Sequence, residues 1–207
     1  MSVFALLLTP LFGFLMISLY RISVESFKKQ LALFGKGALV FVPAYVLVVI
    51  LRRLVSQSYR PAKLYFFAFF EEHFLFYVVL LGGFVAFWGL ANLYRTKILD
   101  FVSFASGFYS LGALQTVLEN HGQIGPYHLF LLPIMRVGMI VLTALFAVKY
   151  LNAFGVFRVL YAFCLFLLPF VAGLFSTLYH ANYRIVASVL TVALLPAAFA
   201  AWYFLRE

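Results

Sequence analysis

Residues 64–84 read "LYFFAFFEEHFLFYVVLLGGF", a long apolar run that contains two adjacent glutamates and a histidine. A helix rises about 1.5 Å per residue, so roughly 20 apolar residues cross the hydrocarbon core of a bilayer. The apolar residues are continuous and do not alternate with polar ones as in the strands of a membrane barrel. The stretch therefore predicts a transmembrane helix that carries Glu71, Glu72 and His73.

The composition of the whole chain agrees with this prediction. Of the 207 residues, 66% are hydrophobic, 20% are aromatic and only 10% are charged, and the mean hydropathy is +1.08. Soluble domains typically have about 45–50% apolar and about 25% charged residues. A chain with so little charge cannot cover a surface that faces water. We expect an all-α, polytopic transmembrane helical bundle that forms a single integral membrane domain over residues 1–207.

A window of about 19 residues predicts about seven membrane spans. A polar connection, "RISVESFKKQ", follows the first span, and "ENHGQIGPYH" is the clearest loop because it contains two glycines and a proline. No internal repeat is visible. The expected spans cover residues 3–20, 33–51, 64–92, 98–118, 128–150, 156–179 and 183–205.

The net charge of +9 does not indicate a nucleic-acid partner, because the basic residues lie near the ends of the spans. Lys28, Lys29, Arg52 and Arg53 are examples, and cations at these places bind lipid headgroups. We therefore expect membrane lipid as a partner and no nucleic acid. Both sets of connections carry several basic residues, so the positive-inside rule does not give an orientation.

Alternation of the spans places the polar groups relative to one another. The connections between spans 2 and 3, 4 and 5, and 6 and 7 must share one face of the membrane. Glu71 and Glu72 lie roughly 10–12 Å below that face at about 1.5 Å per residue. His121 and His128 belong to the second of these connections, and His180 borders the third. The acidic pair and the histidines are thus expected toward one face.

Two glutamates at membrane depth require a chemical reason, since each acidic residue costs about 2.5–3.5 kcal/mol near the centre of a span. Successive helical residues point about 100° apart, so the two carboxylates can flank one polar cavity. Close carboxylates separate their pKa values, so that one is ionised while the other holds a proton. The pair therefore suits a general base or metal ligand beside a proton donor. The structural alternative is an ion pair with Lys63 or Arg136.

Zinc is the metal that fits these residue types. It binds glutamate oxygen and histidine nitrogen, and a catalytic site leaves one position for water. Glu71 or Glu72 could supply such ligands together with His180 and one of His128 or His121. Taken alone, His180 in "STLYHANYR" is also consistent with a polar anchor at the end of a span. His73 has no assigned role.

Five segments together resemble the PrsW family of intramembrane proteases, a group related more distantly to the CAAX proteases. "FFAFFEEHFLFYVVL" is similar to the family's glutamate-pair helix, and "LLPFVAGLFSTLYHANY" to the segment that ends in its functional histidine. The other three are "LALFGKGALVFVPAYVLVVILRRLV", "SFASGFYSLGALQTVLENHG" and "LLPIMRVGMIVLTALFAVKYLN".

The resemblance implies an intramembrane peptidase of the bacterial cytoplasmic membrane with Glu71, Glu72 and His180 as catalytic residues. The residue types separately suggest zinc as a cofactor, with Glu71, Glu72, His180 and His128 as its ligands. The implied substrate is a transmembrane or membrane-anchored protein, such as an anti-sigma-factor-like one.

The chain departs from the family pattern at four places. Leu75 stands where the family has a lysine, and Gly112-Ala113 stand where it has a Glu-Asn pair. Arg136 is the polar residue near the position of an expected histidine, and Arg184 replaces an acidic residue.

Other functions remain open from the sequence. A catalytically inactive relative that binds membrane partners through the same cavity would explain the departures. The segment "FEEHFLF" also resembles the glutamate-pair motif of membrane lycopene cyclases, which suggests a lipid- or carotenoid-modifying enzyme. A proton-coupled carrier is a further alternative, although the inverted repeat common in carriers is not visible.

Overall fold

The computed structural model describes residues 10–12, 15, 24–55, 69–88, 97–119 and 125–205. Within these ranges the regular elements are all helices, which confirms the all-α prediction. They are α2 (Val24–Val55), the π-helical turn η1 (Phe70–Leu75), α4 (Phe76–Trp88), α5 (Ile98–Glu119), the π-helical turn η3 (Tyr127–Leu131), α6 (Leu132–Asn152), α7 (Gly155–His180) and α8 (Arg184–Leu205).

Five helical segments in the described part of the chain are long and apolar enough to cross a membrane. A sixth, shorter apolar helical segment covers His73–Phe87, which includes the end of η1 and nearly all of α4. The chain is therefore an integral membrane protein. The predicted count of about seven spans is not confirmed, because most of residues 3–20 lie outside the described residues and the helix described within 64–92 is shorter than a span. The five long segments are Ser26–Leu51, Ile98–Leu118, Tyr127–Asn152, Gly155–His180 and Arg184–Phe204.

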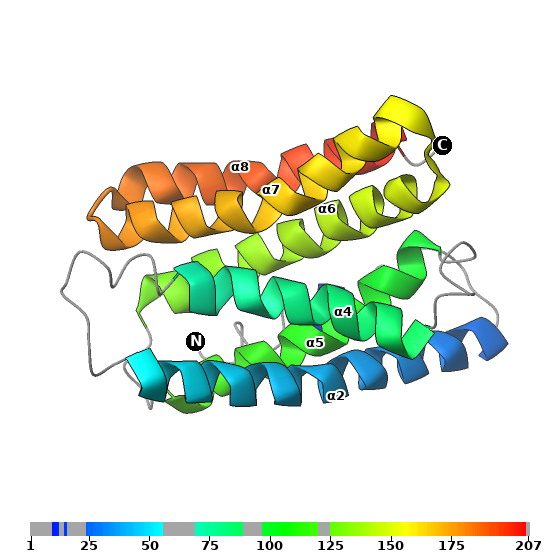
Figure 1. Cartoon of the computed structure of the whole chain (residues 1–207). Helices are drawn as coiled ribbons and strands as arrows, with labels where there is room; N and C mark the ends of the chain where they lie inside the picture. The colour runs from blue at the N-terminus through cyan, green and yellow to red at the C-terminus, as the bar shows by residue number, and fades with distance from the viewer. Residues whose placement is uncertain are drawn as a thin grey trace.

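The helices alternate in direction, as the span order requires. In Figure 1, α2, α5 and α7 run from right to left, whereas α4, α6 and α8 run from left to right. The left end of the bundle therefore holds the C-terminal ends of α2, α5 and α7 and the start of η1, η3 and α8. We call it the histidine end, because His73, His128 and His180 belong to η1, η3 and the last turn of α7.

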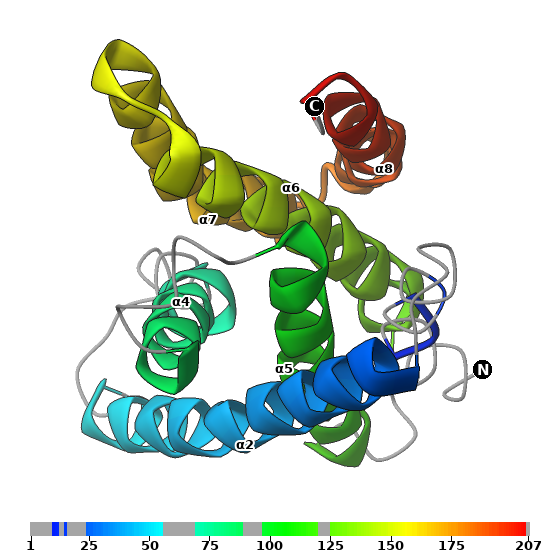
Figure 2. The same cartoon turned by 90° about the vertical axis from the view of Figure 1, so that its right-hand side faces the viewer.

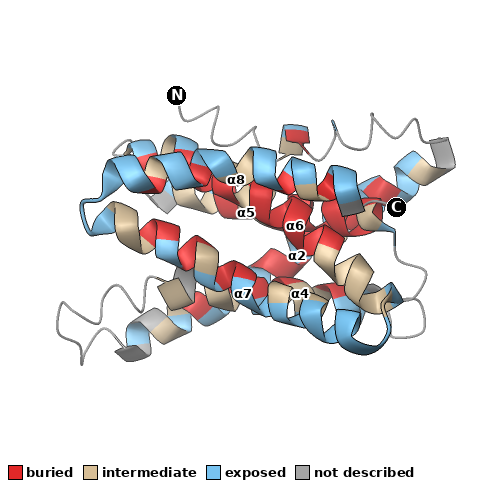
Figure 3. Cartoon of the chain, turned by 90° about the horizontal axis from the view of Figure 1, so that it is seen from above, coloured by how far each residue is buried: buried red, intermediate tan, exposed pale blue. Residues whose placement is uncertain are grey.

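The helices form two groups that meet at α5 and α6. One group contains α2, α4 and α5, and the other contains α6, α7 and α8 (Figure 2). Helix α6 lies innermost, with most of its residues buried, whereas α7 and α8 turn large apolar side chains outward (Figure 3). Phe157 and Ile185 are 66% and 82% exposed, and they belong to the apolar surface that lipid tails cover.

Glycines bring α2 and α5 into unusually close contact. A Cβ atom at Gly37 would collide with the backbone carbonyl of Phe104, and one at Gly107 would collide with the backbone carbonyl of Phe34. Small residues at helix crossings are the usual means of packing in membranes, where apolar side chains gain little from leaving lipid. The reciprocal pair of contacts therefore fixes how α2 crosses α5.

A buried carboxylate joins α2 and α5 at the end of the bundle opposite the histidine end. Asp100, in the first turn of α5, is fully buried and lies 2.9 Å from Lys29 Nζ. The Gln30 amide donates to Asp100 Oδ1 at 2.7 Å, and the backbone N–H of Lys97 donates to Oδ2 at 3.1 Å. With three polar neighbours, the Asp100 carboxylate is satisfied within the protein.

Candidate functional site

The glutamate pair lies on a π-helical turn. Glu71 and Glu72 are in η1, which runs directly into α4, and His128 is in the second π-helical turn, η3, which runs into α6. π-Helical turns are rare, and they occur frequently at functional sites because the widened turn changes the direction of side chains. Both turns of this kind in the described part of the chain lie at the histidine end.

The turn that carries the glutamates packs against α7. The Phe69 ring, just before η1, fills the space beside Gly173, and it also lies 5.3 Å from the Phe170 ring between centroids. Phe74, near the end of η1, also packs on Phe170, with 6.1 Å between the ring centroids. Helix α7 then continues for seven residues to His180. The sequence elements that carry Glu71, Glu72 and His180 are thus neighbours, although they lie about 100 residues apart in the chain.

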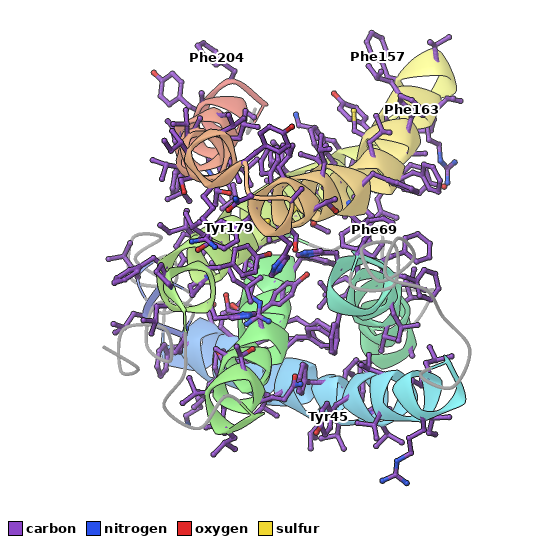
Figure 4. All side chains as sticks on the ribbon, turned by 90° about the vertical axis from the view of Figure 1, so that its left-hand side faces the viewer. Tyr45, Phe69, Phe157, Phe163, Tyr179 and Phe204 are labelled. Carbon is purple, nitrogen blue, oxygen red and sulfur yellow. The ribbon has the colours of Figure 1, made fainter. Side chains whose placement is uncertain are left out.

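Two of the predicted histidines meet around one tyrosine. The buried ring of Tyr127 lies 5.1 Å from the His128 ring and 5.2 Å from the His180 ring, between centroids. Tyr179 completes the cluster at 4.9 Å from Tyr127. Figure 4 shows Phe69 and Tyr179 on the inner side of α7, whereas Phe157, Phe163 and Phe204 point away from the bundle. The His180 side chain itself is exposed, as expected for the last residue of the helix.

His73, to which the sequence assigned no role, lies within the site. Its side chain is only 8% exposed, and its imidazole interacts electrostatically with both Arg136 and His180. His128 interacts with the same two residues. Three histidines and one arginine therefore gather where η1, η3, α6 and α7 meet. A single histidine in an apolar segment gives no sign in the sequence of whether it faces lipid or the protein interior.

Arg136 lies further from the histidine end along the same helical segment than His128 does. It is in the second turn of α6, and its guanidinium carbon lies 5.9 Å from the centre of the Tyr109 ring on α5. One guanidinium nitrogen is 3.7 Å from the place that a Cβ atom at Gly112 would occupy. The absence of a side chain at Gly112 thus leaves room for the guanidinium against the backbone of α5.

An open groove lies beside this part of α5. It has a volume of about 530 Å³ and is lined by α2 and α5, with almost only apolar atoms at its surface. Val42 and Leu118 on its rim are about half exposed, so the groove faces lipid. Phe41 lines the groove and also packs beside Gly112, where its ring would be 3.1 Å from an added Cβ.

The predicted ligand set is only partly within the described residues. The side chains of Glu71 and Glu72 lie outside them, as does His121, so their contacts and the alternative ion pair with Arg136 remain predictions. Among the described side chains, no group of three or more histidine, cysteine or acidic residues could hold a metal ion. His128 and His180, two of the predicted zinc ligands, lie close to the same tyrosine, Tyr127.

Comparison with known proteins adds no assignment. No protein-family model, curated protein or solved structure matches the chain. The resemblance to the PrsW family, based on the glutamate pair and His180, therefore remains a prediction.

Proposed function

We propose that this protein is an intramembrane protease that hydrolyses a peptide bond in a transmembrane or membrane-anchored substrate. The observation that supports this best is the packing of η1, which carries Glu71 and Glu72, against the helix that ends at His180. Intramembrane ionisable residues are expensive and are functional by default. Here two acidic residues, three histidines and an arginine belong to turns that meet at one end of a lipid-embedded bundle.

The proposed reaction is the addition of water to an amide. One glutamate of the pair accepts a proton from water as the oxygen attacks the carbonyl carbon, and the C=O electron pair moves onto the carbonyl oxygen. When this tetrahedral intermediate collapses, the C=O bond forms again and the C–N bond breaks. The leaving nitrogen takes the proton, which gives a carboxylic acid and an amine. His180 orients the water or stabilises the charged intermediate.

Zinc is compatible with the residue types of the site. Glu71, Glu72, His180 and His128 would hold it. When bound, zinc acts as a Lewis acid and lowers the pKa of a coordinated water to about 7. Elemental analysis of the purified protein tests this, with about one zinc per chain expected. A double His128→Ala, His180→Ala variant should lose the metal while keeping its helical circular-dichroism spectrum. Absence of zinc from the wild-type protein would leave the glutamate pair alone as the water-activating group.

The substrate class follows from the position of the site. Residues at the histidine end lie within or next to segments that cross the membrane, so a scissile bond must reach them from lipid or from the adjacent interface. A single transmembrane helix, unwound locally to expose its amides, fits this requirement. An anti-sigma-factor-like protein in the bacterial cytoplasmic membrane is one substrate of this type.

The test uses proteoliposomes that contain the purified full chain and a panel of single-span peptides. Each peptide carries a fluorophore and a quencher on either side of a helix-weakening Gly-Gly step at a different depth. Glu72→Gln and His180→Ala should abolish cleavage while the protein remains folded in the membrane. Tyr203→Phe, on the exposed face of α8, is the matched control and should cleave normally. Wild-type cleavage no faster than that of Glu72→Gln would reject the protease and favour a binding protein without catalysis.

A further inference from the structure

Arg136 carries a positive charge within a segment that crosses the membrane, near its histidine end. It belongs to a segment that crosses the membrane, nine residues after Tyr127, which corresponds to a depth of about 13 Å at about 1.5 Å per residue. A cation at that depth is costly and points to a function. The side chain is half-buried, and the ring of Tyr109 and the backbone at Gly112 define its position from the side of α5.

The electrostatic neighbours of Arg136 include two histidines of the histidine end. His73 directly follows Glu72 on η1, is buried, and interacts with Arg136. His128, on η3, also interacts electrostatically with this arginine. Arg136 therefore lies within electrostatic range of both π-helical turns, in a setting where the surrounding apolar atoms weaken charge screening.

We propose that Arg136 is the catalytic residue that stabilises the oxyanion of the hydrolytic reaction, an inference that rests on the proposed protease function. As water adds to the amide carbonyl, a full negative charge forms on the carbonyl oxygen. A guanidinium N–H that donates to this oxygen lowers the barrier, because the charge is larger in the transition state than in the substrate. The same interaction relaxes when the C=O bond forms again and the C–N bond breaks.

Gly112 is the second part of this arrangement. The structure places Gly112 on α5 and Arg136 on α6 against each other. A side chain at residue 112 would begin 3.7 Å from the guanidinium. A carboxylate there would neutralise part of the positive charge, and a bulky group would displace it. Glycine at residue 112 leaves room for the guanidinium of Arg136 and adds no charge beside it.

Charge substitutions at both positions test the proposal in the proteoliposome assay. Arg136→Gln should lower kcat about 100- to 1,000-fold, the usual loss for one oxyanion donor, with little change in KM. Arg136→Lys keeps the charge and should retain more activity than Arg136→Gln. At Gly112, Glu and Gln are matched in size, so Gly112→Glu should lower kcat further than Gly112→Gln because only the carboxylate neutralises the guanidinium.

The outcomes distinguish this proposal from the protease assignment. If Glu72→Gln abolishes cleavage but Arg136→Gln leaves kcat unchanged, the protease assignment stands and the role of Arg136 is wrong. Equal kcat values for Gly112→Glu and Gly112→Gln would also contradict it. If Glu72→Gln and Arg136→Gln both cleave normally, the protease assignment itself fails. A loss in Arg136→Gln that appears as a lower melting temperature, with normal kcat for the folded fraction, identifies a structural residue and rejects the proposal.

Discussion

The ring of Phe69 occupies the space that a side chain at residue 173 would need, so Gly173 allows the beginning of η1 to lie directly on α7. This contact determines the distance between the glutamate-bearing turn and the helix that ends at His180. Gly173→Ala should push the two apart. We expect a loss of stability of about 1–3 kcal/mol, as for other overpacked sites, together with reduced cleavage. Thermal unfolding in detergent and the peptide assay measure the two effects.

A smaller residue at position 69 should reverse that loss. The double variant Gly173→Ala, Phe69→Ala is expected to regain stability and activity relative to Gly173→Ala alone, because alanine lacks the Cγ, Cδ2 and Cε2 atoms that meet the new Cβ. Gly82→Ala on α4 is the control, since nothing lies within 4 Å of a Cβ at that position. Additive effects of the two substitutions would show that the contact does not set the η1–α7 distance.

Alanine at Gly107 should destabilise the protein more than alanine at Gly173. The obstacle at Gly107 is the backbone carbonyl of Phe34, which cannot rotate away as a side chain can, so α2 and α5 must separate. Gly35→Ala, also on α2, meets open space and should stabilise the helix by about 0.5–1 kcal/mol. Similar unfolding temperatures for the Gly107 and Gly35 variants would contradict the close crossing of α2 and α5.

The sequence predicted the all-α class and the five long apolar helices, because length and continuous apolarity are enough to identify a membrane span. It also predicted that Glu71, Glu72, His128 and His180 lie toward one face, since alternation depends only on the order of the spans. The orientation of side chains within each helix could not be predicted. The spans are apolar on nearly every face, so no polar stripe marks the inward side.

The role of His73 and the contact of Arg136 with Gly112 were not predictable for a related reason. Helical periodicity assumes about 100° per residue, and this value fails across the π-helical turn at Phe70–Leu75. Gly112 and Arg136 lie on different helices, and nothing in their local sequence indicates that α5 and α6 bring them together. Such contacts depend on tertiary packing.

Loss of the carboxylate at Asp100 should reduce stability without changing the chemistry. Asp100→Ala removes the acceptor of Gln30 and the partner of Lys29, and we expect it to cost about 1–3 kcal/mol. Lys29→Met should cost about 1 kcal/mol or less, because the lysine side chain is half exposed and screened. Asp100 is in the first turn of α5, and α5 begins at the end of the bundle opposite to the one where α7 ends at His180 (Figure 1), so kcat of the folded protein should not change. A large fall in kcat for Asp100→Ala, at full folding, would contradict this separation.

Cysteine labelling in sealed vesicles should show on which side of the membrane each end of α7 lies. The single native cysteine, Cys164, is first replaced by alanine. Tyr183→Cys and Gly125→Cys lie at the histidine end, next to the starts of α8 and η3, and should react with an impermeant maleimide from the same side. Phe154→Cys precedes α7 and is 86% exposed, so it should react only from the other side. Labelling of Tyr183→Cys and Gly125→Cys from opposite sides would break the alternation that brings His128 and His180 together, and the hydrolytic site would then have no common face on which to form.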